Sequence, residues 1–134
     1  MTKEYYFKTE GLLIWRPTGV IQIETIQDFV KFLEECVATH NHDFSRFIDL
    51  SLIEGISVNY EELYGIAADR REHANKKFDK IVNLAFYVNN ALSFGMARMY
   101  ENLLDSSAYN LGIFYSLKEV ADFLDVEISL LSEQ

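Results

Sequence analysis

Hydrophobic and polar positions follow two different periods along this chain. Apolar or aromatic runs of strand length recur at residues 4–8, 12–16, 46–50, 81–88 and 109–115. After most of these runs, apolar residues return every three to four positions, in segments that open near Thr25, Asn59, Asn90 and Ser116. Runs of the first kind predict strands and segments of the second kind predict amphipathic helices. Their alternation predicts an α/β domain with a largely parallel sheet.

The first two runs are separated by only Thr9-Glu10-Gly11, which is the spacing of a hairpin. An extended run at 20–23 follows the break at Pro17 to Gly19, where we expect a bend or bulge at Gly19. Residues 81–88 are apolar on both alternations, which is typical of a central strand covered on both faces. The prediction is one domain over residues 1–134: a mixed, mostly parallel sheet with an N-terminal antiparallel hairpin and about four helices.

The segment from Arg46 to Leu63 carries the most information about a site. An apolar strand ends at Asp49, Gly55 marks a turn, and Ser57 and Asn59 precede the next helix. A helix start offers unpaired N–H groups and a partial positive charge, so this point of the fold suits an anion. As ordinary turn and cap residues, Ser57 and Asn59 would instead contribute only about 1 kcal/mol each to stability.

Composition favours a single packed core in a reducing compartment. The 134 residues are 49% hydrophobic and include 10 Phe, 8 Tyr and 1 Trp, enough apolar area for one domain. The single cysteine, Cys36, has no partner for an internal disulfide, and the N-terminal residues lack the pattern of a secretion signal. No apolar run approaches the roughly 20 residues of a membrane span. The expected location is cytoplasmic.

Charge argues against nucleic acid as a partner. The formal net charge is −9 at pH 7, and a negative field repels phosphate backbones. One basic stretch stands out, with Arg70, Arg71, Lys76, Lys77 and Lys80 interleaved with acidic residues. Cations near the end of a helix, facing solvent, explain this stretch more simply than an anion-binding patch does.

Residues with catalytic or metal-binding chemistry are sparse. Cys36 lies on the buried side of its predicted helix, and neither a Gly-x-Ser-x-Gly elbow nor a glycine-rich phosphate loop is present. Cys36 and His40 share a helical face, and His42 and Asp43 follow, but no second ligand pair is spaced to close a metal site. We therefore expect no enzyme activity, no cofactor and no metal.

Several segments together resemble a known bacterial family. They are Gly19-Val-Ile, Phe47-Ile-Asp-Leu-Ser, Phe94-Gly-Met-Ala-Arg-Met-Tyr100 and the run from Gly112 to Leu124. With the order of predicted elements, they look like SpoIIAA-like (STAS/Sec14-like) proteins over nearly the whole chain. The resemblance implies a wound βα fold shared by anti-sigma-factor antagonists, which are switched by phosphorylation of a serine, and by Sec14-type lipid carriers.

The phosphorylation switch can be compared residue by residue within that resemblance. Aligning Asp49-Leu-Ser with the strand end of the antagonists places Ser57-Val58-Asn59-Tyr60 over their Asp-Ser-Ser-Gly motif, with Val58 in the phosphoacceptor position. The switch is therefore expected to be absent. A shift of one residue would place Ser57 there, where a helix dipole would favour an added phosphate.

The function that these observations favour is a noncatalytic binding or regulatory module of the STAS-like type. Open α/β sheets place ligands beyond the carboxyl ends of their strands. The candidate ligand- or partner-binding residues at those ends, with a protein as the expected partner, are Ser57, Asn59, Asn89, Asn90 and Arg98. Asp49 and a bound ligand are the two candidate partners for the Arg98 guanidinium.

Two alternatives belong to other functional classes. One is a carrier of a small apolar or lipid-like ligand, with a pocket lined by Phe94, Met96, Met99 and Tyr100. The chain is too short for the gate of a long lipid carrier, so only a small ligand fits this hypothesis. The other is a homodimeric scaffold that pairs through the aromatic edge strand Tyr5-Tyr6-Phe7.

Overall fold

The computed structural model describes residues 4–8, 11–40, 44–105 except 78–80, and 107–132. Five strands form one sheet in the order β1-β2-β4-β6-β7. Their bounds are β1 Tyr5–Lys8, β2 Leu12–Trp15, β4 Ser45–Asp49, β6 Val82–Tyr87 and β7 Tyr109–Phe114. β1 pairs antiparallel with β2, whereas the other neighbours are parallel. The predicted α/β class, with a mixed and mostly parallel sheet and an N-terminal hairpin, is confirmed.

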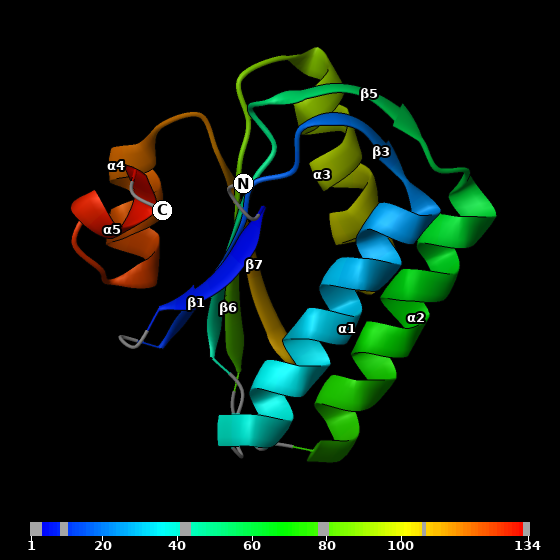
Figure 1. Cartoon of the computed structure of the whole chain (residues 1–134), viewed down its shortest axis with the longest axis horizontal. Helices are drawn as coiled ribbons and strands as arrows, with labels where there is room; N and C mark the ends of the chain where they lie inside the picture. Colours follow the sequence, from blue (N-terminus) through cyan, green and yellow to red (C-terminus); the bar gives the residue numbers. More distant parts are fainter. Residues whose placement is uncertain (1–3, 9–10, 41–43, 78–80, 106, 133–134) are drawn as a thin grey trace.

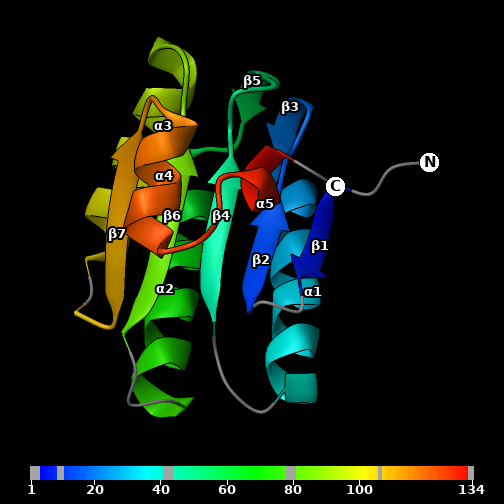
Figure 2. The ribbon, with the colours of Figure 1, turned by 90° about the vertical axis from the view of Figure 1, so that its left-hand side faces the viewer.

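Helices cover the sheet on both faces. Their bounds are α1 Ile23–His40, α2 Tyr60–Lys77, α3 Ala91–Leu104, α4 Leu117–Leu124 and α5 Ser129–Ser132. α1, α2 and α3 lie on one face and α4 and α5 on the other (Figures 1 and 2). Each crossover from β2 to β4, β6 and β7 moves in the same direction along the sheet, and right-handed crossovers in one direction place their helices on one face. None of the helices described combines the length and apolarity that a membrane crossing requires.

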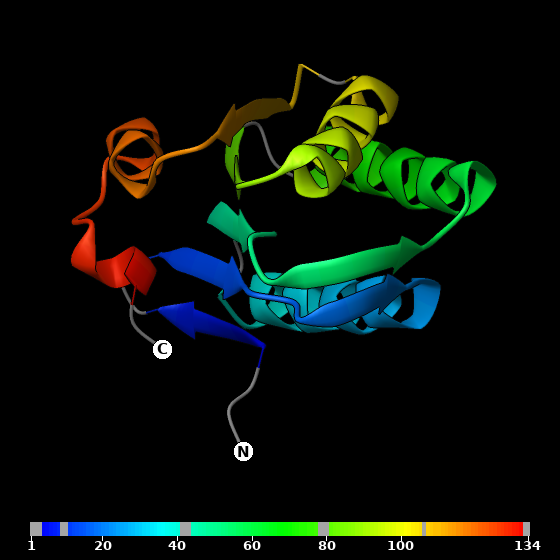
Figure 3. The same ribbon diagram turned by 90° about the horizontal axis from the view of Figure 1, so that it is seen from above.

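A second, two-stranded parallel sheet extends beyond the first. It pairs β3 Gly19–Gln22 with β5 Ile53–Ser57. Seen from above, β3 leads to the start of α1 and β5 leads to the start of α2 (Figure 3). Gly19 adopts a φ of 69° and the register shifts between Gly19 and Val20, which confirms the expected irregularity there. The predicted turn at Gly55 is wrong, because Gly55 lies inside β5 and pairs with Val20.

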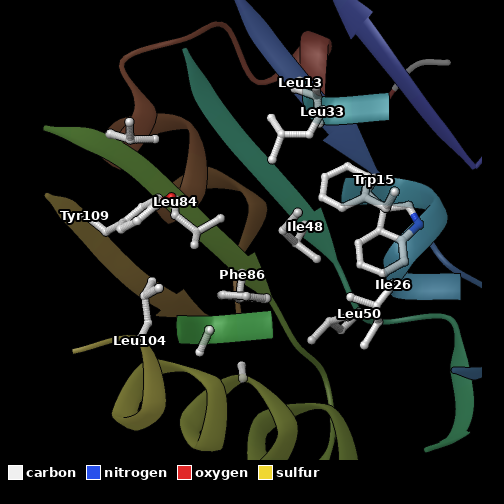
Figure 4. Close-up of a cluster of buried hydrophobic side chains, with 14 of the residues drawn as sticks. Leu13, Trp15, Ile26, Leu33, Ile48, Leu50, Leu84, Phe86, Leu104 and Tyr109 are labelled. Atoms are coloured by element: carbon white, nitrogen blue, oxygen red, sulfur yellow. The ribbon is translucent and has the colours of Figure 1, made fainter. Parts of the chain in front are cut away.

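Alternate residues of the inner strands fill two separate cores. On the face of α1 to α3 lie Leu13, Trp15, Ile48, Leu84 and Phe86, which come from three neighbouring strands (Figure 4). Their neighbours along the strands pack on the other face, with Leu12, Ile14, Phe47 and Ala85 against Val120, Ala121, Leu124 and Leu131. β6 is therefore covered on both faces as predicted. The middle strand of the five is β4 rather than β6, because β7 adds only one strand beyond β6.

Candidate functional site

The first pair of predicted site residues lies at the end of β5 and the start of α2. Ser57 is the exposed last residue of β5 rather than part of a helix start. Asn59 caps α2: its Oδ1 accepts from the Glu62 N–H at 2.8 Å, and the Glu62 carboxylate accepts from the Asn59 N–H at 3.0 Å. This reciprocal arrangement is a capping box. The side-chain oxygen of Asn59 is thus used to start the helix.

The second pair forms the start of α3. Asn90 Oδ1 accepts from the Ser93 N–H at 2.9 Å, and Ser93 Oγ accepts from the backbone N–H groups of Asn89 and Asn90. Ser93 is fully buried, whereas Asn89 and Asn90 are exposed. These bonds satisfy donors that the first turn of a helix leaves free. Asn90 therefore acts as a cap, and the exposed side chain of Asn89 projects from the same turn.

Arg98 does not contact Asp49. The Arg98 side chain is exposed and pairs with Glu101 at 2.9 Å on its own helix. Asp49 instead pairs with Arg16 at 2.9 Å and accepts hydrogen bonds from the N–H and Oγ of Ser51. Four of the five predicted residues thus make contacts in three separate groups: the α2 cap, the α3 cap and an ion pair on α3. Ser57 instead pairs with Gln22 of β3.

A cavity lies between the main sheet and helices α1, α2 and α3. Its volume is about 70 Å³, and the lining is almost entirely apolar. The strands contribute Trp15, Arg46, Ile48, Leu84 and Phe86, and the helices contribute Ile26, Phe29, Val30, Leu33, Leu63, Ile66, Arg70, Met96 and Tyr100. A water-sized void needs only about 10–15 Å³ on this scale. The cavity therefore has room for a small molecule but not for an acyl chain.

Two buried arginines and a tyrosine give the cavity one polar region. Arg46, on the middle strand β4, is only 3% exposed. Its guanidinium lies 5.4 Å from the ring centre of Tyr109 and donates to the Tyr109 hydroxyl at 3.5 Å, and that hydroxyl in turn donates to the Arg70 carbonyl at 3.2 Å. Tyr109, which lies outside the lining, thus links Arg46 to the backbone of α2.

Arg70 reaches from α2 toward α1. Its Nη1 lies 3.0 Å from Glu34 Oε2 on α1 and 3.8 Å from Asp69 Oδ2. The Arg70 side chain is 6% exposed, whereas that of Glu34 is 44% exposed. The Nε–H of Arg70 and the Nε1–H of Trp15 are buried without a hydrogen-bond partner in the described part of the chain. Buried donors left without an acceptor cost about 1–3 kcal/mol each, so such atoms need an explanation.

Tyr100 completes this polar region as a neutral donor. Burial raises the pKa of the Tyr100 hydroxyl far above its ordinary value, and nearby Tyr109 raises it further. Arg46 and Arg70 lower the same pKa by a smaller amount, and all three side chains line the same cavity. The phenol therefore stays protonated near neutral pH and can donate a hydrogen bond.

The pocket predicted from the sequence agrees only in part with this cavity. Met96 and Tyr100 line it, whereas Phe94 and Met99 are 37% and 44% exposed on the outer side of α3. Sequence reasoning missed Arg46 and Arg70 as lining residues. Arg70 follows Leu63 and Ala67 at helical spacing, so the pattern that marks the buried side of α2 also includes it. On β4, the apolar residues that follow Arg46 in the sequence were the signal that Arg46 is buried.

In the basic stretch from Arg70 to Lys80, both arginines make contacts with other helices. Arg70 makes the ion pair with Glu34, and Arg71 donates to the carbonyls of Leu103 and Leu104 at the end of α3. A cation is favourable at the C-terminus of a helix. The side chains of residues 74–80 lie outside the described residues, so the prediction for the lysines is not tested.

One group of side chains has the composition of a metal site. Ligand atoms of Glu34, Asp69 and His73 lie within 4.8 Å of one another on α1 and α2. His73 contacts Glu34 at 3.3 Å and Asp69 at 3.5 Å. Both carboxylates also contact the Arg70 guanidinium, and this fixed cation opposes the binding of a second one. The group is best described as an ion-pair network that joins the two helices.

The thiol considered for catalysis and metal binding is half-buried on α1. Burial, with a smaller contribution from Glu35, raises the pKa of Cys36 above its ordinary value. The thiol is therefore protonated near neutral pH, and a thiol is a weaker nucleophile than a thiolate. The His40 ring contacts the Cys36 carbonyl at 2.9 Å and lies against Phe7. His42 and Asp43 lie outside the described residues.

Comparison of this chain with protein-family models, with curated proteins and with solved structures found no match.

Proposed function

We propose that this protein is a noncatalytic binding module that takes a small molecule into the cavity between the sheet and helices α1 to α3. The supporting observation is a void of about 70 Å³ among apolar side chains. Protein interiors contain few voids larger than a water molecule, because each one forfeits contact energy. A ligand that fills a cavity of this size would restore the lost contact energy.

The absence of an activated nucleophile among the described residues supports a noncatalytic role. Cys36 has a raised pKa, and Ser93 Oγ bonds within the α3 cap. The proposed module keeps the wound βα arrangement that the SpoIIAA-like resemblance implies. Both the resemblance and a cytoplasmic location remain predictions.

A second candidate is a protein partner at the carboxyl ends of the strands. Leu52 and Tyr60 are 54% and 59% exposed and lie on either side of Ser57 in the sequence. Large exposed apolar side chains are typical of protein-binding surfaces when they cluster. The candidates Ser57, Asn59, Asn89, Asn90 and Arg98 belong to this second proposal. Homodimerisation through β1 is likewise untested; there Tyr5 and Phe7 pack against Phe29, Phe32, His40 and Phe44.

The cavity proposal is tested with Trp15, which lines the cavity and is the single tryptophan of the chain. We expect 2-methylpropan-1-ol, a small neutral probe, to change Trp15 fluorescence in a saturable way. The Ile66→Phe variant fills the cavity from α2 and should abolish saturation. Ile128→Phe adds the same volume at an exposed position outside the cavity and should leave binding unchanged. A signal that does not saturate, or that is equal in all three proteins, contradicts the proposal.

A further inference from the structure

The polar region of the cavity carries information about the charge of the ligand. Arg46 and Arg70 both line the cavity and are 3% and 5% exposed. Placing cationic groups beside an apolar void is costly unless an anion accompanies them. For Arg70 that anion is Glu34, which contacts a single nitrogen, Nη1, and lies half in solvent. The opposite side of the guanidinium is where a second acceptor would have to bind.

The buried Nε–H of Arg70 marks that second acceptor position. It has no hydrogen-bond partner within the described residues, although it sits on a side chain that lines the cavity. The Nε–H is half of the fork with which arginine grips the two oxygens of a carboxylate. The Tyr100 hydroxyl, held protonated by burial, is a neutral donor in the same lining.

We infer that the ligand is a small aliphatic carboxylate, held by its carboxylate at Arg70, Arg46 and Tyr100 with its apolar part in the cavity. The inference rests on the proposed function, because it assigns the chemical class of the molecule bound at that site. The apolar part is small: a cavity of 150 Å³ accommodates benzene, so about 70 Å³ suits about three carbon atoms. Isobutyrate has this size and shape.

A single negative charge fits the surroundings better than two. Glu34 and Asp69 already lie 3.0 and 3.8 Å from Arg70 Nη1, and the whole chain carries a net charge of −9. Like charges at such separations repel, and the repulsion grows with the charge of the ligand. A monocarboxylate is therefore favoured over a phosphate ester or a dicarboxylate.

The test compares isobutyrate with 2-methylpropan-1-ol, which have the same carbon skeleton, by titration followed through Trp15 fluorescence. We expect the wild-type protein to bind the acid at least about tenfold more tightly than the alcohol, as a hydrogen bond to a charged group implies. Arg70→Met should remove this preference, and Tyr100→Phe should reduce it. Lys118→Met, which removes an exposed cation on α4 that pairs with Asp122, should leave it unchanged.

The outcomes separate this inference from the proposed function. Equal binding of acid and alcohol contradicts the carboxylate assignment and leaves the cavity proposal standing. Binding of neither probe contradicts both. Tighter binding of the acid that persists in both Arg70→Met and Tyr100→Phe places the carboxylate elsewhere and also overturns the inference. Circular dichroism of each variant verifies that it is folded.

Discussion

Each face of the sheet holds an arginine paired with a carboxylate, and the two pairs differ in what surrounds them. On the face of α4 and α5, Arg16 lies 2.9 Å from Asp49, and their side chains are 14% and 8% exposed. On the face of α1 to α3, Arg70 lies 3.0 Å from Glu34, but the carboxylate is 44% exposed. The first pair is closed within the fold, whereas the second has one member in solvent.

The remaining contacts of the two arginines sharpen the contrast. Arg16 also bonds to the Leu131 carbonyl of α5 and to the Tyr6 hydroxyl, and its guanidinium lies over the Phe47 ring. It thereby ties the C-terminal helix to the hairpin. Arg70 borders a cavity and keeps a buried Nε–H without a partner among the described residues. The contacts of Arg16 fit a structural role, whereas those of Arg70 are the ones on which the proposed ligand site rests.

The largest expected effect comes from replacing each arginine in turn by methionine. Arg16→Met leaves the Asp49 charge buried with only Ser51 to stabilise it, so we expect the free energy of unfolding to fall by about 3 kcal/mol or more. Arg70→Met leaves Glu34 in contact with water and adds apolar surface, so we expect a change within about 1 kcal/mol. Urea denaturation measures both. Equal losses would show that the two pairs have the same role.

A smaller effect on stability is expected from replacing one glycine by alanine on each face of the sheet. At Gly112 of β7, a Cβ would lie 2.6 Å from Cε2 and Cζ of Phe114 and 3.3 Å from Cε1 of Phe123 on α4. The Gly112→Ala variant should lose about 1–3 kcal/mol of stability through overpacking.

The matched substitution is Gly95→Ala on α3, where a Cβ meets no atom within 4 Å. Alanine is a better helix former than glycine, so this variant should gain up to about 1 kcal/mol. Thermal and urea denaturation give the sign of each change. A loss at Gly95, or no change at Gly112, would mean that packing on the two faces is not as the structure has it.

The smallest expected effect concerns pH on the cavity side. The pKa of Tyr100 is raised above 10.0 in the folded protein, first by burial and then by Tyr109. The folded state therefore holds this proton more tightly than the unfolded state does. The resulting contribution to stability is complete below pH 10 and is lost as the pH rises through the folded pKa.

Urea denaturation of Tyr100→Phe across the alkaline range isolates this contribution. Above pH 10 the stability of the variant should fall less steeply than that of the wild-type protein. Tyr64→Phe, at an exposed position of α2, serves as the control and should follow the wild type. Parallel curves for Tyr100→Phe and the wild type would contradict the raised pKa.

The sequence by itself determined most of the strands, most of the helices and several caps. The runs at 46–50 and 81–88 match β4 and β6 to within one residue at each end, because strands buried on both faces carry apolar residues on both alternations. Helices start after Asn59 and Ser116 as predicted, and the side chains of these two residues accept from the N–H groups of Glu62 and Glu119. These features depend on contacts within a few residues, so local sequence specifies them.

The tertiary structure alone decided β5, the partner of Asp49 and the cavity. β5 is short and contains Gly55, and it exists because β3 lies beside it. Asp49 is joined to Arg16, 33 residues earlier in the chain, and not to Arg98. The cavity combines side chains from three strands and three helices. Local periodicity indicates which side chains are buried. The distances between them depend on how elements far apart in the sequence pack together. That packing decides which buried charges meet and where space is left for a ligand.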